Sequence, residues 1–164
     1  MSARRRVRFS LSSTMGWEFT PLVEKVRLAE QLGFEGFYAS DHMLGVAGVP
    51  RDVPFMEPWT LLAALAPQTS ALRLGVLVSG ATYWHPSMLA KIASTLDVIS
   101  GGRGGLGLGG GWPASRGCWP TCASCLALVG GPLNVRASMS RICSRMRLMP
   151  PMCWPLMKAA RSAW

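Results

Sequence analysis

Residues 74–112 read LGVLVSGATYWHPSMLAKIASTLDVISGGRGGLGLGGGW, and this stretch decides the fold of the chain. The apolar run at 74–78 predicts a strand that is buried on both faces of a parallel sheet. Pro86 opens a helix whose apolar residues repeat at helical spacing, and a glycine pair ends it. A second short strand is predicted at 105–108. Because a helix that joins two parallel strands crosses over right-handedly, the stretch predicts a βαβ unit whose strands end on one common face.

The sequence before this unit repeats the alternation of strand and helix. Strands are predicted at 7–11 and 36–39. One helix is predicted to begin after Thr20 as its N-cap and to end at Gly33, and another is predicted to begin at Pro58. The pattern therefore predicts an α/β fold built on a parallel sheet.

Two polar residues, Asp41 and His42, directly follow the predicted strand at 36–39. In barrels of parallel strands, active sites lie at the carboxyl ends of the strands, which is where this pair lies. The residues alone nevertheless favour the alternative, in which Asp41 is a loop residue that caps its own turn.

The glycines near the end of the opening stretch resemble part of a GxGxxG nucleotide loop. No helix with an acidic partner follows them, so the sequence does not favour a dinucleotide-binding fold.

Four sequence motifs occur in order at compatible spacing: LRLG, TYWHP, LAKIASTLDVISGGR and LGLGGGW. Through them, residues 5–112 resemble the luciferase-like monooxygenase family, whose members are (β/α)₈ barrels that use FMN or the deazaflavin coenzyme. Such a barrel needs about 250 residues, and the chain has 164. The resemblance thus implies the N-terminal half of a TIM-type barrel, with four strands alternating with three helices, and an oxidoreductase that acts on a small molecule.

The resemblance also implies a site. Asp41 and His42 would be catalytic and lie near the cofactor ring, with His42 as a proton donor or orienting group. The Leu77–Val78 bond matches a position where deazaflavin members carry a non-prolyl cis peptide behind the ring. His85 is either an N-cap or a direct contact to the cofactor. The implied cofactor-binding residues are Leu77, Val78, Ser79, Gly80, Thr82, His85, Gly109, Gly110 and Gly111, and no metal is implied.

The sequence changes character after Trp112. All eight acidic residues precede position 98 and all five cysteines follow Trp112, so the net charge of +9 is mainly a property of the tail. We therefore divide the chain into a partial barrel domain at 1–112 and a basic tail at 113–164 that has no helical or strand periodicity.

Three hypotheses account for the tail. The first is a change of reading frame near residue 112, which would make the tail non-native and the chain a truncated member of doubtful activity. The second is a zinc site, because Cys118, Cys122 and Cys125 lie close in sequence, although neither a second cysteine pair nor a histidine accompanies them. The third is a nucleic-acid-binding arm with Trp119 and Trp154 as stacking partners, which we consider unlikely.

The remaining expectations concern location and assembly. The odd number of cysteines and the absence of a secretion signal predict a cytoplasmic protein, and no apolar run is long enough to span a membrane. Half a barrel leaves an open sheet edge at its first and fourth strands, which predicts homo-oligomers or aggregates.

Overall fold

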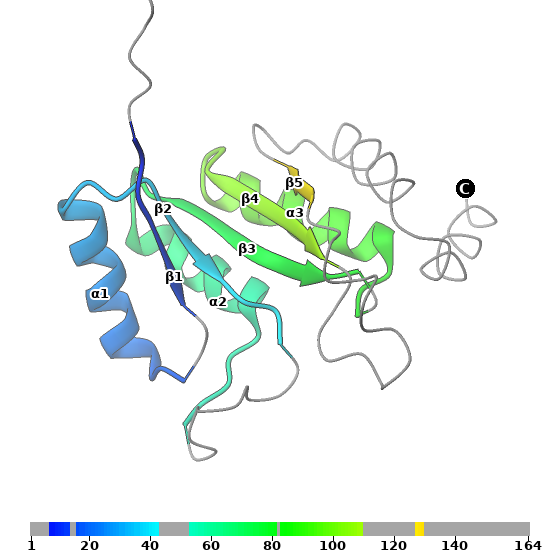
Figure 1. Ribbon diagram of the computed structural model, residues 1–164, viewed down its shortest axis with the longest axis horizontal. Coiled ribbons are helices and arrows are strands. Elements are labelled where there is room, and N and C mark those ends of the chain that lie inside the picture. The colour runs from blue at the N-terminus through cyan, green and yellow to red at the C-terminus, as the bar shows by residue number, and fades with distance from the viewer. Residues whose placement is uncertain (1–6, 14–15, 43–52, 82, 110–126, 130–164) are drawn as a thin grey trace, which may run out of the picture.

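Parallel strands alternate with helices along the chain, as the sequence predicts (Figure 1). The structure, a computed structural model, describes residues 7–13, 16–42, 53–81, 83–109 and 127–129. The elements are β1 (Ser10–Ser13), α1 (Phe19–Gln31), β2 (Gly36–Ala39), α2 (Pro58–Leu65), a 3₁₀ turn (Ala66–Gln68), β3 (Arg73–Gly80), α3 (Pro86–Ile99), β4 (Gly104–Gly109) and β5 (Ala127–Val129).

The sheet has the order β1-β2-β3-β4-β5, and its first four strands are parallel. The predicted strand at 36–39 and the helix starts at Pro58 and Pro86 are confirmed. β1 begins at Ser10, not at Val7, because its ladder starts where Ser10 meets Gly36.

The N-terminus of α1 also differs from the prediction. Glu18 is the N-cap and Thr20 lies inside the helix. Pro21 is tolerated there because the amides of the first helical turn have no partner within the helix.

The two faces of the sheet carry different side chains. Alternate residues such as Phe37, Val76 and Leu106 are buried in a core shared with α1, α2 and α3. On the opposite face, a Cβ atom on Gly36 or Gly75 would lie 2.9 or 3.0 Å from the ring of Tyr38. Glycines on neighbouring strands thus make room for this ring. Helices on one face of a parallel sheet are the arrangement of one part of a barrel wall.

The tail contributes one strand that the sequence did not predict. β5 pairs antiparallel with β4, with Leu106 opposite Val129 and Leu108 opposite Ala127. β5 therefore adds three strand residues to a tail in which the sequence shows no strand periodicity, and the prediction that the whole edge of β4 is open is wrong. Unpaired backbone groups at a sheet edge can be satisfied by any extended segment, and three residues are too few to show a sequence period.

Arg103 joins the segments at the amino ends of the strands. Its guanidinium donates five hydrogen bonds: to the carbonyl oxygens of Ala66, Thr69, Leu72 and Ser100, and to Thr69 Oγ1. The fork-shaped guanidinium can satisfy this many acceptors at once, so Arg103 fixes the entry to β3 against the entry to β4.

Glu30, at the end of α1, holds the same entry to β3. Its carboxylate accepts hydrogen bonds from the backbone amides of Ser70, Ala71 and Leu72. Burial alone raises the pKa of Glu30, but these amides and the charge of Arg103 outweigh it, and the net pKa is lowered. The amino ends of the strands are thus built for stability.

No helix in the described part of the chain combines the length and the apolar character needed to cross a membrane.

Candidate functional site

The carboxyl ends of β1 to β4 meet at one edge of the sheet because these strands are parallel. We call this the C-terminal edge; among the described residues it comprises Ser13, Ser40, Asp41, His42, Ser79, Gly80, Ala81, Tyr83, Trp84 and His85. Five of the eleven residues singled out in the sequence lie here: Asp41, His42, Ser79, Gly80 and His85. Leu77 and Val78 lie within β3, and Gly109 ends β4. Thr82, Gly110 and Gly111 lie outside the described residues.

Asp41 is buried at this edge, with 6% of its surface exposed. Its Oδ2 accepts a hydrogen bond of 2.7 Å from Nε1 of Trp84, in the connection between β3 and α3. The Ser79 hydroxyl and the Gly80 amide also donate to the carboxylate. Asp41 therefore does not cap its own turn; it joins the end of β2 to β3 and to the following connection.

A second tryptophan extends this network from α2. Nε1 of Trp59 donates to Oγ of Ser79 at 3.1 Å, and both side chains are buried. Trp59, Ser79, Asp41 and Trp84 form a continuous hydrogen-bonded group, which we call the Asp41 cluster. It links four segments of the chain at the C-terminal edge.

The charge state of Asp41 reflects opposing effects. Burial raises its pKa most strongly, and the carboxylate of Glu57 adds to the increase. Hydrogen bonds from Trp84, Ser79 and Gly80 lower it, because they stabilise the ionised form. The net pKa lies above the ordinary aspartate value.

The two histidines have different surroundings. His85 is the N-cap of α3: its Nδ1 lies 3.4 Å from the Ser87 amide and 2.6 Å from the Ser87 hydroxyl. Of the two roles that the sequence left open for His85, the structure contains the capping contact. His42 is half-buried, and no hydrogen bond joins it to another described residue. Of the two imidazole rings, that of His85 is therefore engaged by the protein, and that of His42 has no hydrogen bond to a described residue.

β3 contains the implied backbone feature: the Leu77–Val78 peptide bond is cis. The register between β3 and β4 shifts between Val76 and Ser79. Opposite the shift, a Cβ on Gly109 would lie 2.5 Å from Cγ2 of Val78. Gly109 thus makes room for the side chain of Val78, a requirement that is separate from the approach of a cofactor.

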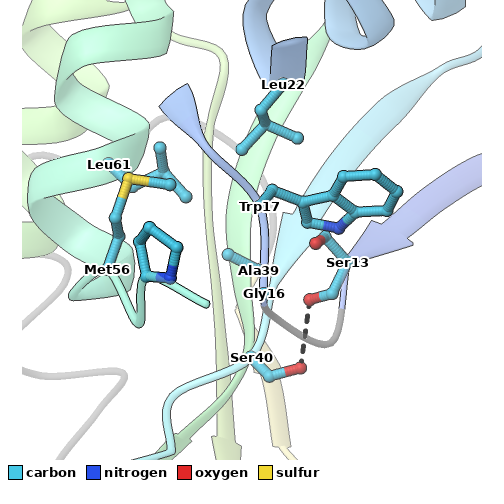
Figure 2. Close-up of a pocket in the computed structure, with 9 residues that line it drawn as sticks. Ser13, Gly16, Trp17, Leu22, Ala39, Ser40, Met56 and Leu61 are labelled. Carbon is cyan, nitrogen blue, oxygen red and sulfur yellow. Dashed lines mark hydrogen bonds between the residues drawn. The ribbon is translucent and has the colours of Figure 1, made fainter. Parts of the chain in front are cut away.

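A small hollow of about 290 Å³, partly open to solvent, lies where α1 and α2 meet the ends of β1 and β2 (Figure 2). Trp17, Met56 and Leu61 supply apolar walls, and the Ser40 hydroxyl donates to the Ser13 carbonyl at 3.3 Å. None of the residues that line the hollow is charged. Its enclosed part is only about 20 Å³, which is far smaller than a ligand pocket.

The sequence did not identify the two tryptophans of the Asp41 cluster as members of a site. Trp59 lies buried in α2, and Trp84 lies in the connection between β3 and α3. The available signal is chemical: a buried indole N–H needs an acceptor, and Ser79 and Asp41 are the polar residues at the ends of the adjoining strands.

No group of three or more potential metal ligands occurs among the described residues. The cysteines of the proposed zinc site, and the tail tryptophans proposed to stack on nucleic acid, lie outside those residues.

Comparison with known proteins supplies the family. The model of a family described as luciferase-like monooxygenase matches residues 6–119. Among curated relatives, a pyrimidine monooxygenase from Bradyrhizobium is 33% identical over 119 residues, covering 67% of this chain and 33% of the relative. A phthiodiolone/phenolphthiodiolone dimycocerosates ketoreductase from Mycobacterium tuberculosis is 34% identical over 107 residues, covering 56% of this chain and 28% of the relative. The chain thus spans about a third of the length of its curated relatives.

Solved structures agree on the fold. The coenzyme F420-dependent tetrahydromethanopterin reductase from Methanopyrus kandleri superposes with a TM-score of 0.57 at 22% identity, covering 83% of this chain and 39% of that one. The oxygenating constituent of 3,6-diketocamphane monooxygenase from Pseudomonas putida, in complex with FMN, gives 0.57 at 19% identity, covering 84% and 38%. At these identities the likeness concerns the fold: the described strands and helices correspond to the first half of luciferase-like barrels.

Proposed function

Since the chain belongs to the luciferase-like monooxygenase family, we propose that its C-terminal edge is the ring-binding part of a flavin- or deazaflavin-dependent oxidoreductase site. The observation that supports this most is the convergence of Asp41, Ser79, Gly80 and Trp84, from three segments, into one hydrogen-bonded group at the strand ends. In parallel α/β folds this is the edge at which ligands bind.

The donor set fits the ring of such a cofactor. The edge presents the partly exposed aromatic rings of Tyr83 and Trp84 and the partly exposed imidazole of His42. Planar ring systems are held by aromatic stacking and by a few placed hydrogen bonds. When bound, the cofactor supplies oxygen activation or hydride transfer.

The same donor set does not fit the cofactor phosphate. Among the described residues that follow β1, β2 and β3 at this edge, none is lysine or arginine. A phosphate held by two charge-assisted hydrogen bonds gains about 3–6 kcal/mol, or roughly 10²–10⁴-fold in affinity. We therefore propose that this edge holds the ring weakly and that other groups must hold the phosphate.

Within the site, we assign to His42 the exchange of protons with a small-molecule substrate. Its ring is half-buried and has no hydrogen-bond partner among the described residues, whereas the carboxylate of Asp41 is occupied by donors. Imidazole suits this task because it changes charge near neutral pH in its unperturbed state.

Titration with FMN and riboflavin tests the proposal, because the two share the ring and only FMN carries the phosphate. We would follow the fluorescence anisotropy of each flavin as the protein concentration rises; the initial slope is proportional to affinity even for weak binding. We expect equal slopes within about threefold, because the phosphate adds less than about 1 kcal/mol here. A parallel titration with the deazaflavin coenzyme shows which ring is preferred.

Two variants complete the test. His42→Ala should reduce both flavin slopes, whereas Arg8→Lys, an exposed site at the opposite end of β1, should change neither. Slopes indistinguishable from zero for all three cofactors would contradict ring binding. A slope for FMN that is 10²-fold steeper than for riboflavin would show that the chain itself holds the phosphate.

A further inference from the structure

We propose that Asp41 is a positioning residue whose carboxylate holds the connection between β3 and α3 against the ends of β2 and β3. It thereby fixes Ser79, Gly80 and the segment leading to His85 for the cofactor ring. This inference rests on the proposed function for its ligand, but its geometry is a property of the described residues alone.

With Asp41 ionised, the hydrogen atoms of the Asp41 cluster can be assigned in one direction only. An indole N–H donates and cannot accept, so Trp59 must donate to Ser79. The Ser79 hydroxyl, having accepted, has its single hydrogen free to donate to Asp41. Trp84 donates to the same carboxylate from the other side. Three donors thus converge on Asp41 once the Gly80 amide is included.

Only the ionised carboxylate can accept from Trp84, Gly80 and Ser79 at the same time. A protonated acid has a hydrogen of its own; Trp84 and Gly80 cannot accept it, and if Ser79 accepts it, Ser79 no longer donates to the carboxyl group. Ionised Asp41 therefore sets the position of Trp84, whereas protonated Asp41 cannot hold all three donors.

Asp41 is the described residue that accepts the hydrogen bond of the Trp84 indole N–H. The neighbouring carboxylate, Glu57, accepts from the amides of Trp59 and Thr60 at the start of α2. No salt bridge joins Asp41 to a described cation. The other titratable side chains at this edge are His42 on its own segment, Tyr83 in the connection after β3 and His85 at the start of α3. Hydrogen bonds, rather than a counter-charge, hold the ionised carboxylate in place.

A positioning role separates Asp41 from catalysis. Its side chain is buried and its oxygens are engaged by protein donors, so it reaches the ring through Ser79, Gly80 and Trp84. Asp41→Asn keeps the size of the side chain but presents an NH₂ group toward donors. Trp84→Phe removes one donor and keeps an aromatic ring.

The first measurement is the emission of Trp84 as a function of pH, taken as the difference between the wild-type chain and Trp84→Phe. We expect this component to change in one step whose midpoint lies above the ordinary aspartate value of 3.8. The step should be absent when the same difference is taken in the Asp41→Asn background. It should persist in Glu57→Gln and shift to lower pH, because the Glu57 charge raises the pKa of Asp41.

The second measurement is a double-mutant cycle on the FMN anisotropy slope. Loss of the Asp41–Trp84 hydrogen bond should lower the slope about tenfold in either single variant. Because both variants remove the same contact, the double variant should lose little more, still about tenfold. Near-additive losses, about a hundredfold in the double variant, would overturn the inference, and so would a Trp84 step that survives Asp41→Asn.

The two proposals can fail separately. A Trp84 step that depends on Asp41, in a chain with no flavin slope, supports the positioning geometry and overturns the proposed function. A flavin slope that is unchanged in Asp41→Asn supports ring binding and overturns the positioning role. If Asp41→Asn does not fold, the step in the wild-type difference and its shift in Glu57→Gln decide the question.

Discussion

Replacing Arg103 by lysine should destabilise the protein far more than a conservative charge-preserving change at the surface. The guanidinium satisfies five acceptors at the amino ends of β3 and β4. A lysine ammonium has three hydrogens, so at least two acceptors lose their donor. Ala66 and Leu72, which supply two of the carbonyl groups, are each 1% exposed. An unsatisfied buried acceptor costs about 1–3 kcal/mol, so we expect a loss of about 2–6 kcal/mol in the free energy of unfolding.

Urea unfolding followed by circular dichroism measures this loss. Arg8→Lys is the matched control, because Arg8 pairs with Glu35 at the surface and 69% of its side chain is exposed. It should cost less than about 1 kcal/mol. Equal losses in Arg103→Lys and Arg8→Lys would refute the view that the five hydrogen bonds of Arg103 fix the strand entries.

Three further changes test other parts of the structure. Glu30→Gln should reduce the free energy of unfolding at pH 7 by about 1–3 kcal/mol. Because folding lowers the pKa of Glu30, this loss of stability should have its full size above pH 4.5, the ordinary pKa. It should disappear as pH falls through the lowered pKa. The pH dependence of stability due to Asp41 has the opposite sign. Because folding raises its pKa, its contribution to stability is full below pH 3.8 and is lost as pH rises through the raised pKa. Asp41→Asn should remove this dependence in urea titrations at several pH values. Gly109→Ala should cost about 1–3 kcal/mol because its Cβ would lie 2.5 Å from Val78. Gly105→Ala, whose nearest contact would be 3.6 Å, is the control, and equal melting temperatures for the two glycine variants would argue against the close packing.

The sequence predicted the elements with strong local signals. Pro58 and Pro86 each begin a helix because proline suits the first helical turn and no later one. The start of β1 was misplaced because Val7 and Phe9 have strand-forming side chains, while the ladder is set by the position of β2, a non-local constraint. β5 was missed for the same reason, since its pairing with β4 decides it.

The candidate site was predictable in position and less so in connectivity. The position of Asp41 and Ser79 at one edge of the sheet follows from the rule that the carboxyl ends of parallel strands meet there. Their link to Trp59 and Trp84 depends on how α2 and the β3–α3 connection pack, which a single sequence does not encode locally. The contact between Val78 and Gly109 is likewise a property of packing: the sequence analysis named both as cofactor-binding residues and did not predict that one packs on the other.

The most direct test of ring binding at the C-terminal edge is the indole N–H resonance of Trp84 in a ¹⁵N-labelled sample. Trp84→Phe assigns the resonance, and Trp59→Phe assigns that of its neighbour in the Asp41 cluster. Added riboflavin should shift the Trp84 resonance in proportion to its concentration, through the ring current and the contact with the edge. A Trp84 resonance that stays fixed as riboflavin is added would contradict a ring-binding site at this edge.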